Sequence, residues 1–91
     1  MTLRYARHAD LRLTALEGEG VALHLGSRRY YSVSESGLDI LQALDVPRTL
    51  DELVAALTRK YDVTADAAGV SAREFLEQAL RDGLVTVEER S

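Results

Sequence analysis

The chain has 91 residues, with 11 lysines and arginines against 15 aspartates and glutamates, and it contains no cysteine. This length allows one domain, which we expect to cover residues 1–91 with an ordered core over about residues 10–87. The lack of cysteine excludes disulfides and thiolate zinc sites and allows a reducing compartment, so we expect a cytoplasmic location. The apolar runs are far shorter than the roughly 20 residues that span a bilayer, so we expect no membrane partner.

The first part of the chain has the alternating pattern of β-strands. Residues 10–16 alternate leucine with polar residues, and residues 21–25 alternate larger aliphatic residues with Ala22 and His24. The second pattern predicts a strand whose larger residues form its apolar face. The letters "EGEG" between the two segments predict a turn, and "GS" at residues 26–27 predicts a two-residue hairpin.

A third strand is predicted over residues 28–33, because "RRYYSV" is rich in aromatic and β-branched residues and contains no proline. Side chains alternate between the two faces of a strand, and we expect Tyr31 and Val33 to point toward the core. The two faces are Arg29, Tyr31 and Val33 on one side, and Arg28, Tyr30 and Ser32 on the other.

Three amphipathic helices are predicted after the strands. Ser34 is a candidate N-cap of the first helix, which ends before Pro47. Thr49 and Glu52 form a capping box for the second helix, because the Thr hydroxyl can accept a hydrogen bond from the amide of Glu52 while the Glu carboxylate reaches back. We expect this helix to reach about Tyr61.

The third helix is predicted to begin somewhere between Thr64 and Ser71, because Gly69 weakens the helical pattern there. Gly83 stands where a left-handed C-terminal cap is needed, and "LVTVEE" after it predicts a short wing strand. The expected buried face of this helix is formed by Ala72, Phe75, Leu76, Ala79 and Leu80.

The helical part of the chain is acidic, since residues 34–91 hold six basic against twelve acidic side chains. A DNA-binding helix is expected to carry lysines and arginines that neutralise phosphates. The charge pattern therefore argues against a nucleic-acid partner, although a winged-helix DNA-binding domain stays an alternative. A module that dimerises through the edge of the third strand is the other alternative.

No arrangement of side chains in the sequence predicts catalysis. Its two histidines, His8 and His24, are expected at the surface, and they are too few for a histidine metal site without cysteine. We therefore expect no enzymatic activity, no metal and no cofactor. The cluster of Arg28, Arg29, Tyr30 and Tyr31 has the composition of a binding surface. It is equally typical of an edge strand whose charged side chains prevent pairing with other chains.

From about residue 11 to residue 87 the chain resembles the PqqD-like family of peptide-recognition domains, also called RiPP recognition elements. The segments that carry the resemblance are "YYSVSESGLDILQAL", "RTLDELVAAL" and "AREFLEQALRDGLV". The resemblance implies an α+β fold in which a three-stranded antiparallel sheet is followed by three helices in a winged helix-turn-helix arrangement. It also implies binding of the leader segment of a ribosomally made precursor peptide.

Family members of this kind bind the leader as an added strand on the third strand, in the cleft beside the third helix. Carried onto this chain, the resemblance implies that the peptide meets Arg28, Arg29, Tyr30, Tyr31, Ser32, Val33, Ala72, Phe75, Leu76 and Ala79.

Two branches of the family differ at positions that can be recognised in this sequence. The pyrroloquinoline quinone branch, whose members act as peptide chaperones for a radical-SAM enzyme, has a Pro-Glu-Gly turn and an aromatic residue after the last helical glycine. This chain has "GSRR" and Leu84 at those places. It is more similar to the stand-alone leader-binding protein of split lasso peptide systems, which works with a separate leader peptidase and a macrocyclase. That similarity implies a leader with a Tyr-x-x-Pro spacing.

Overall fold

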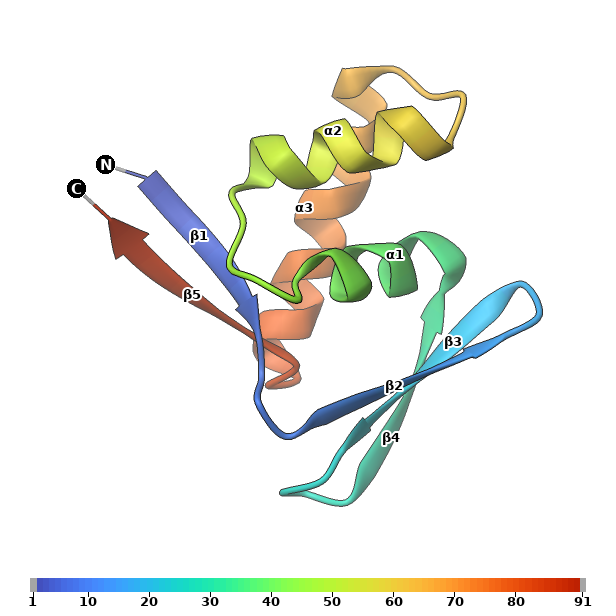
Figure 1. The fold of residues 1–91 in the computed structure, drawn as a ribbon, viewed down its shortest axis with the longest axis vertical. Coiled ribbons are helices and arrows are strands. Elements are labelled where there is room, and N and C mark those ends of the chain that lie inside the picture. Colours follow the sequence, from blue (N-terminus) through green and yellow to red (C-terminus); the bar gives the residue numbers. More distant parts are fainter. Residues whose placement is uncertain (1, 91) are drawn as a thin grey trace.

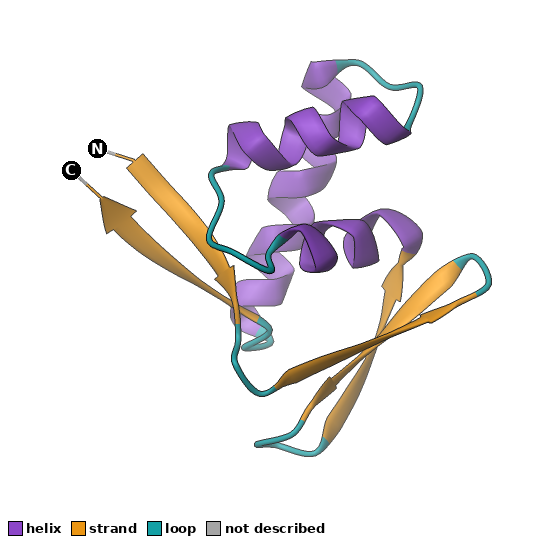
Figure 2. Ribbon diagram, viewed as in Figure 1, coloured by secondary structure: helices purple, strands orange, loops and turns teal. Residues whose placement is uncertain are grey.

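Figure 1 shows the fold in a computed structural model that describes residues 2–90. The elements are, in chain order, β1 (Thr2–Arg7), β2 (Leu11–Leu16), β3 (Glu19–His24), β4 (Arg29–Ser34), α1 (Glu35–Ala43), α2 (Leu50–Lys60), α3 (Ala65–Arg81) and β5 (Val85–Arg90). Strands β2, β3 and β4 form an antiparallel sheet in that order. The three helices are gathered beside this sheet (Figure 2), which confirms the predicted α+β class, three-stranded sheet and three helices.

A second, two-stranded sheet joins the two ends of the chain. Strand β1, for which the sequence predicts no element, pairs antiparallel with β5, from Thr2 opposite Arg90 to Arg7 opposite Val85. A bridge between Tyr5 and Arg48 fastens this ribbon to the segment before α2, with N···O distances of 2.7 and 2.9 Å. The predicted C-terminal strand therefore exists, and it pairs with β1 in a second sheet.

The inward face of β3 differs from the expectation. Ala22 is completely buried beneath α1, whereas Val21 and Leu23 lie on the opposite face, in register with Ser32 and Tyr30. The reason is the close approach of α1, because a Cβ placed on Gly20 would lie only 2.8 Å from Leu38 Cδ1. At Gly20 there is no space for a side chain, and the next residue on this face is the buried Ala22, so the larger Val21 and Leu23 point away from the helices.

The hairpin turns also differ from the prediction. The two-residue turn lies between β2 and β3, where Gly18 has a left-handed backbone with φ of 75°. Strands β3 and β4 are joined instead by a four-residue turn over residues 25–28, in which Arg28 has φ of 59°. Arg28 thus belongs to the turn and not to the third strand.

The predicted helix caps are confirmed. Ser34 caps α1 by accepting a hydrogen bond from the Gly37 amide, and Thr49 and Glu52 form the reciprocal capping box of α2. Thr64 caps α3, so the helix begins at Ala65, near the N-terminal end of the interval predicted for its start. Gly83 follows α3 with the expected positive φ of 75°.

The core lies where α1, α2 and α3 meet each other and the inner face of the sheet. Leu41, Leu53 and Leu76 are its largest fully buried side chains, one from each helix. None of the helices within residues 2–90 has the length and apolar character that crossing a bilayer requires.

Candidate functional site

A groove of about 370 Å³ lies between β4 and α3. Strand β4 is an edge of its sheet, so one row of its backbone N–H and C=O groups faces away from β3 and can pair with another chain. Helix α3 supplies the opposite wall. The groove is lined by Tyr30, Tyr31, Ser32, Val33, Ser34, Phe75, Gln78, Ala79, Asp82 and Leu84.

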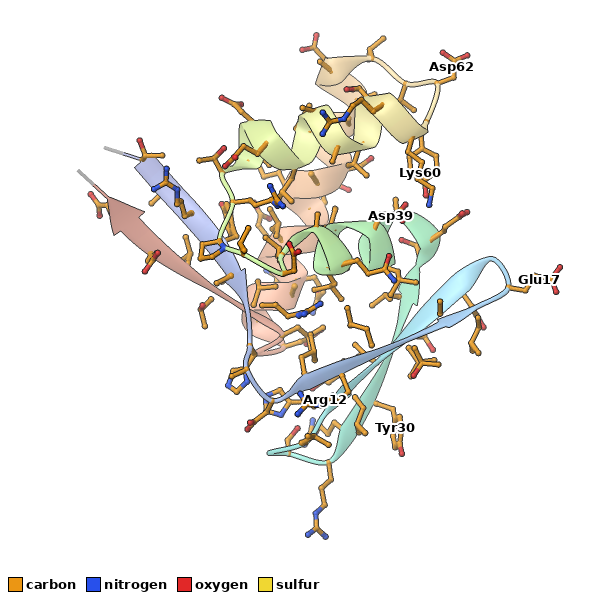
Figure 3. The ribbon with its side chains drawn as sticks, viewed as in Figure 1. Arg12, Glu17, Tyr30, Asp39, Lys60 and Asp62 are labelled. Carbon is orange, nitrogen blue, oxygen red and sulfur yellow. The ribbon has the colours of Figure 1, made fainter. Side chains whose placement is uncertain are left out.

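The strand wall combines buried and exposed side chains. Tyr31 and Val33 are half-buried and pack against the core, as the sequence predicts. The Tyr31 hydroxyl donates a long hydrogen bond of 3.5 Å to the Asp82 carbonyl, which connects the strand to the end of α3. Tyr30 is on the other face of the sheet, with 72% of its surface exposed, and its ring points away from the helices (Figure 3).

The helix wall is formed by side chains at helical spacing on one face of α3. Phe75 is half-buried, and its ring lies directly against Gly37 of α1, where a Cβ atom would come within 2.7 Å of Phe75 Cε1. Gly37 therefore leaves the space in which this ring sits. Ala79 is 1% exposed and forms the small-residue part of the wall, which leaves the groove open beside it.

The structure brings together six of the ten residues that the sequence suggests for peptide binding. These six groove residues are Tyr30, Tyr31, Ser32, Val33, Phe75 and Ala79. Ala72 and Leu76 belong to the buried core cluster, with exposed fractions of 0% and 1%, and they do not line the groove. Arg28, in the turn before β4, and Arg29, the first residue of β4, are exposed and are not part of the groove lining.

Four residues that line the groove were not predicted from the sequence. Gln78 and Asp82 follow Phe75 at i+3 and i+7, so the helical period alone could have placed them on the same face. Gln78 Nε2 donates to Asp82 Oδ1 at 3.2 Å, which holds both polar groups along the groove. Ser34 is the last residue of β4 and Leu84 follows the turn after α3, and both lie just beyond the segments from which the sequence prediction of the site was made.

Asp39 on α1 organises a polar cluster at the end of α2. Its carboxylate accepts hydrogen bonds from Lys60 Nζ at 2.8 Å and from the Tyr61 hydroxyl. Figure 3 shows the Lys60 side chain reaching toward Asp39. Burial, followed by the hydrogen bond to Asp39, raises the pKa of Tyr61, and the same carboxylate raises the pKa of Lys60.

This cluster predicts a loss of stability at alkaline pH. The folded protein holds the Tyr61 proton more tightly than the unfolded chain does, so the corresponding stability is complete below the unfolded tyrosine pKa of about 10 and is lost as the pH rises through the higher folded value. We expect Tyr61→Phe to decline less steeply than the parent protein, measured by urea unfolding from neutral pH to about pH 11. Equal slopes for the two proteins would contradict the role of this hydroxyl.

The two histidines lie against each other and are partly exposed, at the surface where the sequence places them. Their ring centroids are 4.5 Å apart. His8 Nδ1 accepts a hydrogen bond from the Asp10 amide at 3.0 Å, and His24 Nδ1 accepts one from the Ser27 amide at 3.2 Å. These bonds support the turns around the sheet. Within residues 2–90 no group of three or more His, Cys, Asp or Glu side chains is placed to hold a metal ion.

The family model described as coenzyme PQQ synthesis protein D (PqqD) matches residues 19–85, which is most of the chain. The chain belongs to the PqqD family. The matched region of this PqqD-family chain contains β3, β4, all three helices and every residue that lines the groove.

Two solved structures have the same fold as this PqqD-family chain. One, described as TbiB1 in complex with the TbiA(beta) leader peptide, is 22% identical with a TM-score of 0.75 and covers 94% of this chain and 98% of that chain. The other, described as lasso peptide synthetase B1 complexed with the leader peptide, is 17% identical with a TM-score of 0.73 and covers 90% of this chain and 96% of that chain. No curated protein sequence matches the chain significantly.

Proposed function

We propose that this chain binds the leader segment of a ribosomally made precursor peptide, in an extended conformation along β4. The observation that carries the proposal is the free edge of β4 beside a groove whose second wall is α3. Strand addition to an exposed sheet edge is a common mode of peptide binding, in which the ladder supplies affinity and the pockets beside it supply specificity. Membership of the PqqD family supports the proposal, as do the descriptions of the two similar structures as leader-peptide complexes.

The groove matters to affinity because a ladder of hydrogen bonds is too weak alone. About four or five such bonds contribute roughly 0.5–1.5 kcal/mol each. Association and ordering of the peptide cost about 4–15 kcal/mol. Side chains of the peptide must therefore be buried, at about 1.5–3 kcal/mol each, between Tyr31 and Val33 on one wall and Phe75 and Ala79 on the other.

The peptide is proposed to run antiparallel to β4, because the sheet is already antiparallel and antiparallel pairing is slightly more stable per residue. Arg28 in the preceding turn and Arg29 at the beginning of this strand are exposed, and there they favour an acidic leader and mainly speed its encounter with the groove. The polar groups that line the groove are hydroxyl, amide and carboxylate side chains, which suit hydrogen bonding to a peptide. The proposed role is thus binding and not catalysis.

We place the chain in lasso peptide biosynthesis, where it would pass the leader to a separate leader peptidase and a macrocyclase in the cytoplasm. The similarity of its fold to a structure described as lasso peptide synthetase B1 supports this choice over the role of a peptide chaperone for a radical-SAM enzyme. A lasso leader is expected to carry a Tyr-x-x-Pro spacing. Peptides selected for binding to this chain should then converge on that spacing.

The proposal is tested with a peptide selected from a display library of random linear sequences, here called the selected peptide. On titration, amide hydrogen exchange followed by NMR should slow along β4 and along the groove face of α3, because the added strand covers both. Uniform protection over α2 with none on β4 would contradict strand addition. Sedimentation of the chain without peptide separates this result from self-association through the same edge.

A further inference from the structure

The groove continues beyond the end of β4 into a second pocket. Ser34 lines both cavities, because it is the last residue of β4 and at the same time the N-cap of α1. Its hydroxyl accepts a hydrogen bond from the Gly37 amide at 3.1 Å, which fixes the backbone at the junction. A peptide strand that follows the β4 edge as far as Ser34 therefore reaches the entrance of the second pocket.

The second pocket is formed where three helix ends meet. It encloses about 370 Å³, which is at the lower end of the roughly 300–1,000 Å³ typical of ligand pockets. Leu57 of α2 and Ala68 of α3 are buried and form its floor, while Val63 and Ala67 stand exposed at its rim. The lining is mainly apolar, so it suits an aliphatic or aromatic side chain.

The walls of this pocket are held without any ligand. Tyr61 lines the pocket and is tied to α1 by the hydrogen bond from its hydroxyl to Asp39. On the opposite side, Thr64 caps α3 by accepting a hydrogen bond from the Ala67 amide at 3.1 Å. A cavity that is already formed needs little ordering when a side chain enters it.

We infer that this pocket is a second subsite for the peptide, which takes one apolar side chain from the part of the peptide that lies N-terminal to the segment paired with β4. The inference rests on the proposed function and on its antiparallel direction. Because β4 runs from Arg29 to Ser34, the N-terminal end of an antiparallel strand lies at Ser34. Because the second pocket adjoins the groove at Ser34, the side chain that enters it should come from the same peptide, near its N-terminal end.

The test compares two substitutions of alanine by leucine. Ala67→Leu fills the second pocket from its rim, and Leu is nearly as good a helix former as Ala, so α3 should stay intact. Ala55→Leu is the matched control, because Ala55 is also exposed on a helix and belongs to neither the groove nor the second pocket. We expect Ala67→Leu to weaken binding of the selected peptide at least tenfold by fluorescence anisotropy, and Ala55→Leu to leave it unchanged.

A shortened form of the selected peptide tests whether its N-terminal part is what occupies the second pocket. Removal of the residues N-terminal to the paired segment should weaken binding to the parent protein and abolish the difference between the parent and Ala67→Leu, while protection along β4 persists. Equal affinity of the parent and Ala67→Leu for the full-length selected peptide would overturn the second subsite but leave the groove untouched. Loss of β4 protection with both peptides would instead overturn the proposed function itself.

Discussion

Ala79→Leu is expected to lower the affinity for the selected peptide at least tenfold, which corresponds to about 1.4 kcal/mol. Ala79 forms the small part of the helix wall, and the leucine side chain would extend into the space that a peptide side chain needs. Ala79 is 1% exposed and belongs to the core cluster, but it also lines the groove, so the leucine side chain can turn into open space and thermal stability should stay within a few degrees. Fluorescence anisotropy and thermal unfolding measure the two effects.

The control for this experiment is again Ala55→Leu, which makes the same chemical change on an exposed position of α2. A large fall in the unfolding temperature of Ala79→Leu would mean that the added methyl groups collide with the core, where overpacking costs about 1–3 kcal/mol. Undiminished binding by a folded Ala79→Leu protein would place the peptide outside the groove between β4 and α3.

Leu76→Ala and Phe75→Ala should have opposite main effects although the two residues are neighbours. Leu76 is 1% exposed in the core, so its truncation should reduce the free energy of unfolding by about 2–5 kcal/mol. Phe75 is half-buried and lines the groove, so its truncation should cost less than the roughly 3–5 kcal/mol of a fully buried phenylalanine. Urea unfolding gives both values.

Binding of the selected peptide separates the two variants further. Phe75→Ala removes part of the groove wall and should weaken binding, whereas Leu76→Ala should bind normally at a temperature where it is folded. Equal binding losses in the two folded variants would mean that the wall and the core beneath it do not act separately. The pair thus distinguishes the lining of the site from its support.

Local signals in the sequence determine the helices and much of the site. Ser34, Thr49 and Gly83 mark helix ends by hydrogen bonds or backbone conformations that involve only neighbouring residues, and each has the predicted role. The strand that carries the tyrosine pair and the helix face with Phe75 and Ala79 are likewise visible as periods of two and of 3.6 residues. The resemblance to the PqqD-like family, carried onto this strand and this helix, suggested six of the ten residues that line the groove.

Tertiary structure decided the features that depend on distant parts of the chain. Strand β1 exists because it pairs with β5 from the other end of the chain, and no short window of sequence contains both partners. The inward face of β3 was decided by α1, because Leu38 approaches Gly20 too closely for any side chain there, and this reverses the face that hydrophobicity favours. The second pocket depends on three helix ends that meet only in the folded chain. The periodicity of a sequence shows which face of one helix or strand is apolar. Only the distances between packed segments decide whether that face has room for its side chains and where a cavity remains.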